Sequence, residues 1–250
     1  MSDDISRILR DWPVKDGNVR KLVGDDGRDK IQVRVLINNF HGILQFDCDG
    51  RPDGETPHGH PFALDFYEEE RRKHAGPFTL THEQAQELLA ESSMTYQRYV
   101  LLLQMGDFRR VIRDTERNMR VFRFLNQHAE KEEDRTALEK WWPYILRVHA
   151  TAQALERLQQ KDFAGARQAV QEARAKIEQL DRLDDETFQS EFDRSMEALN
   201  ELEKSIDKDR PLSQIERLER LRDEAVAEEN YELAARLRDR IRALRDQSKA

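Results

Sequence analysis

Hydrophobic and polar residues follow two different periods along this chain, and the change falls near residue 78. In the first part, apolar residues alternate with polar ones on either side of the turn sequence GDDGRD, and GILQFDCDG supplies a further alternating stretch. Alternation with a period of two is typical of half-buried strands, and Asp and Gly tolerate the positive φ angles of a hairpin turn. Residues 1–78 are therefore predicted to form a small twisted antiparallel sheet with one or two helices, one of them over FALDFYEEERRKH. The first strand residues are Val19, Val23, Ile31, Val33, Val35 and Ile37.

From Thr81 onward the apolar residues recur at helical spacing. Thr81 and Gln84 form the pattern of a capping box, in which each residue bonds to the backbone of the other at a helix start. Gly106 and Asp107 interrupt this first long helix, and Pro211 marks a later boundary because proline is favoured at the first helical position. Further helices are predicted over residues 107–129, 135–160, 162–180, 186–207, 211–228 and 230–246.

A short pattern recurs at three of these helix starts, in MGDFRRVIRD, QKDFAGARQAV and EENYELAARLR. In each copy an Asp or Asn that can cap a helix precedes an aromatic residue, and a small or β-branched apolar residue follows three positions later. The pattern predicts helical hairpins whose aromatic residue seals the bend. Because the copies are unevenly spaced, two architectures stay open, a platform similar to tetratricopeptide repeats and an ordinary helical bundle. The capping residues are Asp107, Asp162 and Asn230, the aromatic residues Phe108, Phe163 and Tyr231, and the small residues Val111, Ala166 and Ala234.

These patterns predict an α+β protein that is mostly α. We expect a small N-terminal antiparallel sheet, then antiparallel helical hairpins, then a separate C-terminal helical hairpin. The corresponding domains are residues 1–78, 79–208 and 209–250.

The C-terminal hairpin has a narrow apolar stripe on each helix, as in a coiled coil. Two helices of under about twenty residues bury only one seam, and an isolated hairpin of that size is marginally stable. It must therefore pack on the rest of the chain, on its own copy as a homodimer, or on another protein. The stripes are Ile215, Leu218, Leu221 and Ala225 on the first helix and Ala234, Leu237, Ile241 and Leu244 on the second.

Residues 218–244, LERLRDEAVAEENYELAARLRDRIRAL, resemble the UVR motif, a hairpin shared by the B and C subunits of the bacterial nucleotide-excision nuclease. The stretch from NYE through AARLRD to IRAL carries the most specific spacing, although Phe is commoner than Tyr at the bend of that motif. The residues that match the motif are Leu218, Leu221, Ala225, Tyr231, Ala234, Ala235, Leu237, Arg238, Asp239, Ile241 and Leu244.

The resemblance implies protein docking, because the motif joins the two nuclease subunits hairpin to hairpin. Similar motifs occur in adaptors of Clp-type ATPases and in the activator of a bacterial protein-arginine kinase. The zinc-binding CxxC pairs of that activator and the GxxxxGK[ST] loop of a helicase are both missing from this sequence. We therefore expect a non-enzymatic bacterial adaptor that docks to excision-repair or Clp protease components through the eleven matched residues.

Charge bears on the alternative function, a nucleic-acid-associated DNA repair factor. The net charge of −8 argues against broad adhesion to nucleic acid or to an anionic membrane. One predicted helix is nevertheless locally basic, with Arg109, Arg113, Arg117 and Arg120 along one face, and such a face can contact phosphates. The simpler interpretation is a solvated face that pairs with nearby carboxylates, so we expect no nucleic-acid partner.

Metal binding and catalysis find little support. His58 and His60 in PHGHP can share a metal with Cys48 or His41, but no second ligand pair has metal-site spacing. No catalytic motif is present, and Cys48, the only cysteine, is interpreted as a small half-buried strand residue.

The stretch DCDGRPDGE places three aspartates near glycines, as in a calcium loop. Arg51 occupies the middle ligand position and the closing Glu lies at the wrong distance, which favours an ordinary polar turn. We expect no metal and no cofactor. The sequence also shows neither a secretion signal nor a membrane span, so we expect a cytoplasmic protein. The three aspartates are Asp47, Asp49 and Asp53.

Overall fold

The structure is a computed structural model that describes residues 5–12, 18–38, 40–210, 214–227 and 231–247. It divides into two compact units, Met1–Glu203 and Lys204–Ala250. Helices hold 69% of the chain, and the N-terminal sheet has three antiparallel strands, so the predicted α+β, mostly α class is confirmed. The finer division at residue 78 stays a prediction.

The sheet contains β1 (Val19–Val23), β2 (Asp29–Ile37) and β3 (Phe40–Asp47) in that order. Both predicted strand regions and the third strand are therefore present. The GDDGRD turn closes through a hydrogen bond from the Gly27 amide to the Gly24 carbonyl, and Gly27 has the positive φ of 75° that the turn requires. A short helix, α1 (Ser6–Asp11), precedes the sheet, and the Trp12 carbonyl after it accepts a hydrogen bond from Arg34 Nη1 of β2 at 2.7 Å.

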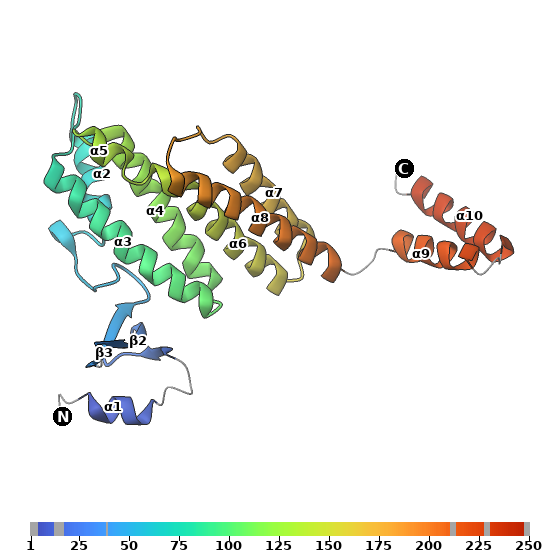
Figure 1. Cartoon of the computed structure of the whole chain (residues 1–250), viewed down its shortest axis with the longest axis horizontal. Coiled ribbons are helices and arrows are strands. Elements are labelled where there is room, and N and C mark those ends of the chain that lie inside the picture. Colours follow the sequence, from blue (N-terminus) through green and yellow to red (C-terminus); the bar gives the residue numbers. More distant parts are fainter. Residues whose placement is uncertain (1–4, 13–17, 39, 211–213, 228–230, 248–250) are drawn as a thin grey trace. The chain divides into compact units, whose positions relative to one another are not determined.

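Helices fill the remainder of the first unit (Figure 1). The elements are η2 (Pro57–Gly59), α2 (Ala63–Lys73), α3 (His82–Gln104), α4 (Phe108–His128), α5 (Glu132–Thr136), η3 (Glu139–Trp141), α6 (Trp142–Gln159), α7 (Phe163–Glu178) and α8 (Glu186–Asp209). The long helices α3, α4, α6 and α7 pack against one another in chain order, and α8 is tied to α6 by a hydrogen bond from the Ser195 hydroxyl to the Pro143 carbonyl.

The helix caps predicted at Thr81, Asp107 and Asp162 are confirmed. Thr81 forms the capping box: the Gln84 amide donates to Thr81 Oγ1 at 3.4 Å, and the Thr81 amide donates to Gln84 Oε1 at 2.9 Å. Asp107 caps α4 and Asp162 caps α7 through the same kind of side-chain acceptor. The third predicted cap, Asn230, lies outside the described residues.

The continuous helix predicted over 135–160 is wrong. The chain instead forms α5, which ends at Thr136, then the single turn η3, and only then α6. Pro143 explains the interruption, because proline lacks an amide hydrogen and fits the first turn of a helix rather than its interior. The ring of Trp142 packs edge-on against Phe122 of α4 at 5.2 Å, which fixes the start of α6.

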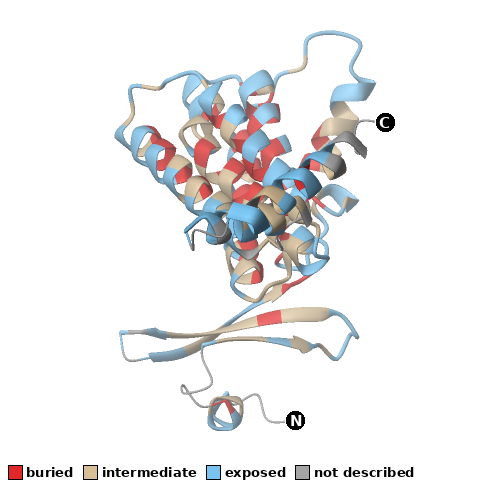
Figure 2. Cartoon of the chain, turned by 90° about the vertical axis from the view of Figure 1, so that its right-hand side faces the viewer, coloured by how far each residue is buried: buried red, intermediate tan, exposed pale blue. Residues whose placement is uncertain are grey.

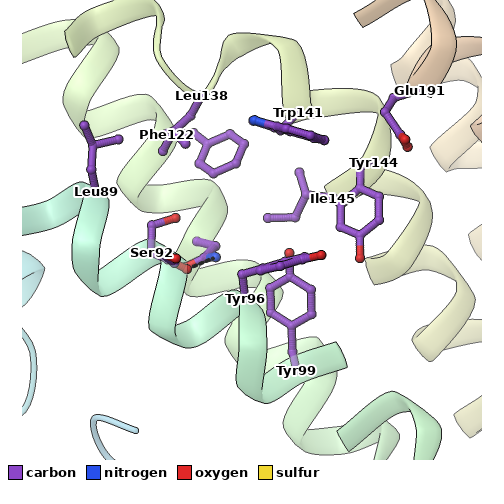
Figure 3. A pocket seen from close by; sticks show the side chains of 12 residues that line it. Leu89, Ser92, Tyr96, Tyr99, Phe122, Leu138, Trp141, Tyr144, Ile145 and Glu191 are labelled. Carbon is purple, nitrogen blue, oxygen red and sulfur yellow. Dashed lines mark hydrogen bonds between the residues drawn. The ribbon is translucent and has the colours of Figure 1, made fainter. Parts of the chain in front are cut away.

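Buried positions are concentrated in the helical layers of the first unit, whereas the strands are mostly intermediate or exposed (Figure 2). Between α3, α4, η3 and α6 the packing leaves a cavity of about 360 Å³ lined by aromatic, aliphatic and polar side chains, among them Tyr96, Tyr99 and Trp141 (Figure 3).

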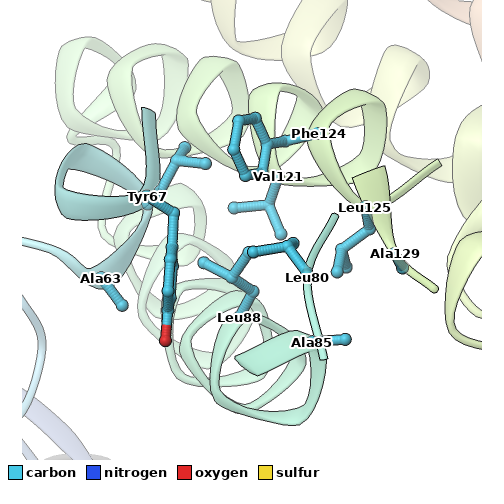
Figure 4. Close-up of a cluster of buried hydrophobic side chains, with 10 residues drawn as sticks. Ala63, Tyr67, Leu80, Ala85, Leu88, Val121, Phe124, Leu125 and Ala129 are labelled. Carbon is cyan, nitrogen blue, oxygen red and sulfur yellow. The ribbon is translucent and has the colours of Figure 1, made fainter. Parts of the chain in front are cut away.

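One hydrophobic cluster holds α2 against α3 and α4 (Figure 4). Its side chains include Tyr67 from α2, Leu88 from α3 and Val121 from α4, which converge on the buried Leu80. The backbone of Leu80 bonds to the chain after α4: its amide donates to the His128 carbonyl, and its carbonyl accepts from Glu130. Both the side chain and the backbone of Leu80 therefore hold the segment that precedes α3 in place.

A second cluster joins the sheet to the helices. Ile31 of β2 and Cys48, directly after β3, are fully buried against Tyr99 and Leu102 of α3 and Val111 of α4. Burial raises the pKa of the Cys48 thiol above its ordinary value. The sheet and the helical layers of this unit therefore share one core.

A buried ion pair reinforces the same junction. The guanidinium of Arg98 donates two hydrogen bonds to the Asp114 carboxylate, at 2.7 and 2.9 Å, and two more to the carbonyls of Asp47 and Gly50. Both ionic side chains are almost inaccessible, at 0% and 1% exposed. One arginine on α3 thus fixes both α4 and the loop that leaves the sheet.

Among the described residues, no helix combines the length and the apolar character needed to cross a membrane.

Candidate docking hairpin

Beyond the end of α8, the described residues of the C-terminal unit form α9 (Gln214–Ala227) and α10 (Tyr231–Gln247), which pack against each other. Both helices predicted in this region are therefore present. Arg245 Nη2 of α10 lies 2.5 Å from Glu219 Oε1 of α9, an ion pair that ties the two helices together away from the bend. The unit is a helical hairpin, as the two apolar stripes predict.

The structure brings the eleven motif residues together on this hairpin, but it does not bury all of them. Ile241 is buried, and Leu218, Ala235, Leu237 and Leu244 are half-buried, so these side chains form the seam between α9 and α10. Leu221, Tyr231, Arg238 and Asp239 are exposed. The side chains of Ala225 and Ala234 lie outside the described set.

Among the described residues of the hairpin, four large apolar side chains are exposed, and these four fall between residues 221 and 233, around the bend. Two of them, Val226 and Leu233, are absent from the predicted set because they lie beside the apolar stripes rather than on them. Single exposed apolar residues are ordinary on protein surfaces, but a group on one short element is typical of an interaction surface. The exposed fractions are 50% for Leu221, 48% for Val226, 67% for Tyr231 and 42% for Leu233.

The expectation that Tyr231 is buried across the bend is wrong within this chain. Tyr231 is the first residue of α10. At 3.6 residues per turn its side chain points about 80° away from that of Ile241, the buried centre of the seam. Tyr231 therefore does not hold α9 against α10, and its ring is available to another surface.

Charged residues cover the remaining surface of the hairpin in local pairs. Arg238 Nε lies 3.0 Å from Asp239 Oδ1, Arg220 pairs with Glu224 one turn along α9, and Arg236 pairs with Glu232 on α10. Exposed pairs of this kind contribute about 0–1 kcal/mol each. They surround the apolar group with a polar rim and add little to the stability of the hairpin.

Comparison with known proteins agrees with this geometry. The family model for the UvrB/uvrC motif matches residues 213–247, which include all of α9 and α10. No curated protein and no solved structure matches the chain. Residues 213–247 therefore carry a UVR motif, which is a protein-interaction motif in excision nuclease subunits and Clp adaptors. The match leaves residues 1–212 without an assigned family.

The predicted basic face on α4 is largely occupied by contacts within the first unit. Arg113 bonds to Asp49 and to the Cys48 carbonyl. Arg117 lies 3.0 Å from Asp65 and 3.5 Å above the Phe62 ring, and Arg120 pairs with Glu68 of α2. Of the four arginines predicted to form this face, Arg109 alone has no ion pair with a described residue. The arginines thus connect α4 to α2 and to the loop after β3.

The residues weighed as metal ligands do not gather around one point. His58 stacks on Phe66 at 4.2 Å and bonds to Glu87, whereas His60 lies 3.6 Å from Glu69. Cys48 is buried in the sheet–helix core and His41 is exposed on β3.

The three aspartates weighed as a calcium loop have separate basic partners. Asp47 accepts from Lys30 Nζ at 2.6 Å, Asp49 accepts from Arg110, and Asp53 pairs with Arg51. The Arg110 guanidinium holds the pKa of the Asp49 carboxyl far below its ordinary value. Each carboxylate therefore forms an ion pair with a side chain of the same unit.

Proposed function

We propose that this protein is a non-enzymatic bacterial adaptor that docks to another protein through the exposed apolar group of its UVR hairpin. The observation that supports the proposal is the position of Leu221, Val226, Tyr231 and Leu233, which surround the bend and leave the seam of the hairpin to other residues. The unit Met1–Glu203 has its own core and acts as a separate folded body that the hairpin delivers to the partner.

The four exposed apolar side chains around the bend determine the expected strength of docking. Full burial of a completely exposed aliphatic or aromatic side chain contributes about 1.5–3 kcal/mol, and these four side chains are 42–67% exposed. Their further burial therefore supplies about 4–5 kcal/mol in total, before the costs of association. We expect a reversible complex rather than a permanent one, as suits an adaptor.

The partner class follows from the motif. In the excision nuclease the motif joins two subunits hairpin to hairpin, so we propose a hairpin-bearing component of excision repair or of the Clp protease system. A nucleic-acid partner is the second candidate, but Arg113, Arg117 and Arg120 already form pairs within the chain. Their use on phosphates requires these pairs to break.

The test is a titration of the full chain against two purified bacterial probes, the B subunit of the excision nuclease and a Clp-type ATPase. A Tyr231→Ser/Leu233→Ser double variant should lose binding at least tenfold and stay folded, because both side chains are exposed in the free chain. Phe40→Ser is a control, since Phe40 is an apolar residue of the other unit that is more exposed, at 77%, than Tyr231 or Leu233. It should bind as the wild type does.

Three results contradict the proposal. One is unchanged binding of either probe by the double variant, and another is equal loss in the Phe40→Ser control. The third is binding of DNA whose affinity falls steeply with salt and is lost on Arg109→Glu, because such salt dependence measures phosphate contacts. Light scattering of the full chain separates a homodimer from a foreign partner, since a homodimer should dissociate in the same double variant.

A further inference from the structure

The two edges of the N-terminal sheet differ in how they are protected against pairing with another strand. β1, at one edge, has five residues and carries Arg20 and Lys21, and charged side chains of this kind discourage strand pairing. β3, at the other edge, has eight residues, Phe40–Asp47, with no Lys, Arg or Pro among them. Its register with β2 is continuous, without a bulge. The β3 edge therefore lacks the features that usually block an exposed edge.

The hydrogen bonds of β3 identify which of its backbone groups face outward. The Asp47 amide donates to the Pro52 carbonyl rather than to β2. Inward and outward groups alternate along an antiparallel strand, so every second residue before Asp47 also turns its amide and carbonyl away from β2. No described residue bonds to these outward backbone groups. They belong to His41, Ile43 and Gln45.

One face of β3 is apolar along its whole length. Phe40, Gly42, Leu44 and Phe46 alternate along this face, opposite β2 residues of the same face. Phe46 packs against the core that joins the sheet to the helices, whereas Phe40 and Leu44 are 77% and 48% exposed. An edge with free backbone groups and exposed apolar side chains is a template for another strand.

We propose that this chain forms a homodimer in which β3 pairs antiparallel with β3 of a second copy, so that Ile43 of each copy lies at the two-fold axis. In this register Ile43 lies opposite Ile43 of the partner subunit, and His41 lies opposite Gln45 of the partner subunit. Each of these pairs exchanges two main-chain hydrogen bonds. A shift of two residues moves one outward residue opposite Asp47, whose amide is already bonded, or beyond the start of β3.

The side chains of β3 also complement themselves in this register. Gly42 lies opposite Leu44 of the partner subunit, so the smallest residue faces a large one. Phe40 lies opposite Phe46 of the partner subunit, and cross-strand aromatic pairs stabilise a sheet. From residue 40 to residue 46 the strand has no Asp, Glu, Lys or Arg, so two copies bring no like charges together. A neutral, self-complementary edge favours a second copy over a charged foreign strand.

The experiment is sedimentation equilibrium of the full chain and of two double variants with charges at positions 41 and 45. His41→Lys/Gln45→Lys places lysines opposite each other across the dimer, whereas His41→Glu/Gln45→Lys places a glutamate opposite each lysine. Both positions are exposed, so both variants should keep the fold. The wild type should dimerise reversibly. The dissociation constant of the dimer should be at least about tenfold higher for the lysine pair than for the mixed pair.

Ile43→Pro tests the backbone contribution. Proline removes the Ile43 amide hydrogen, which faces away from β2, so the change breaks no hydrogen bond between β2 and β3. The folded variant should be monomeric at concentrations at which the wild type is dimeric. If this variant does not fold, the two charge variants still decide the question.

Three outcomes overturn the proposal. One is a wild-type chain that is monomeric at every concentration, and another is equal self-association of the two charge variants. The third is a dimer that dissociates in Tyr231→Ser/Leu233→Ser, because that result assigns self-association to the hairpin. Phe40→Ser should weaken the β3 dimer and leave hairpin docking unchanged, so failure of one proposal leaves the other intact.

Discussion

Removal of Asp114 should destabilise the first unit more than any surface change, because it leaves the Arg98 guanidinium buried without its counterion. Arg98 is 0% exposed and donates two of its hydrogen bonds to Asp114. Loss of one partner of a buried pair costs about 3–5 kcal/mol, since the remaining charge has neither water nor a carboxylate. That is a large part of the about 5–15 kcal/mol that holds a domain folded. Asp114→Ala should therefore lower the urea midpoint sharply.

Tryptophan fluorescence is a suitable assay, because all three tryptophans, Trp12, Trp141 and Trp142, belong to the first unit. Unfolding of the C-terminal hairpin does not change this signal directly. The matched control is Glu70→Ala, which breaks an exposed pair with Lys73 and should cost less than about 1 kcal/mol.

A double variant distinguishes the loss of the Arg98–Asp114 attraction from the cost of leaving one charge buried without a partner. Arg98→Met/Asp114→Leu removes both ions, and replacement of buried pairs by apolar residues of similar volume is often nearly neutral. Here it also leaves the Asp47 and Gly50 carbonyls without their Arg98 donors, which costs about 1–3 kcal/mol. We expect the double variant to be more stable than Asp114→Ala alone. The reasoning is refuted if Asp114→Ala costs less than about 1 kcal/mol, or if the double variant is as unstable as the two single changes added together.

Three further predictions concern buried or capping groups. Burial lowers the pKa of His149 to about 4, so between pH 6.5 and about 4 the unfolded chain binds more protons than the folded one. As the pH falls through this range, the free energy of unfolding of the first unit should decrease by up to about 3 kcal/mol. His149→Gln should flatten this pH dependence in urea titrations at several pH values. The Glu91 carboxylate accepts hydrogen bonds from the Ala63 and Leu64 amides at the start of α2, so Glu91→Ala should cost about 1–3 kcal/mol of stability. Hydrogen-exchange protection should fall first in α2, and an equal fall in α7 would contradict this prediction. Asp162→Ala should cost about 1 kcal/mol through loss of the α7 cap, and an unchanged thermal midpoint would show that the cap contributes nothing.

Local interactions made much of the fold predictable from the sequence. The Thr81 capping box, the Asp107 and Asp162 caps and the turn at Gly27 each depend on residues within four positions of one another, so their patterns are visible in the chain. The hairpin was predictable for a similar reason, because each helix carries one apolar stripe and the bend that joins them is short.

Contacts between distant residues explain what the sequence did not reveal. The start of α2 has no local cap, and Glu91, 28 residues away from Ala63, supplies one. The basic face of α4 suggested phosphate contacts because its partners, Asp49 and Glu68, lie more than 50 residues earlier in the chain. In the docking hairpin, helical periodicity located the seam, but exposure around the bend depends on the angle at which the two helices meet, which no spacing encodes.

Cys48 gives this protein a built-in chemical reporter. The thiol is the only one in the chain, it is fully buried where the sheet meets α3 and α4, and its raised pKa keeps it protonated. Because only an exposed thiolate reacts rapidly, a thiol reagent can modify this residue only when the junction opens. The rate of labelling thus measures how often the sheet separates from the helices while the protein remains otherwise folded.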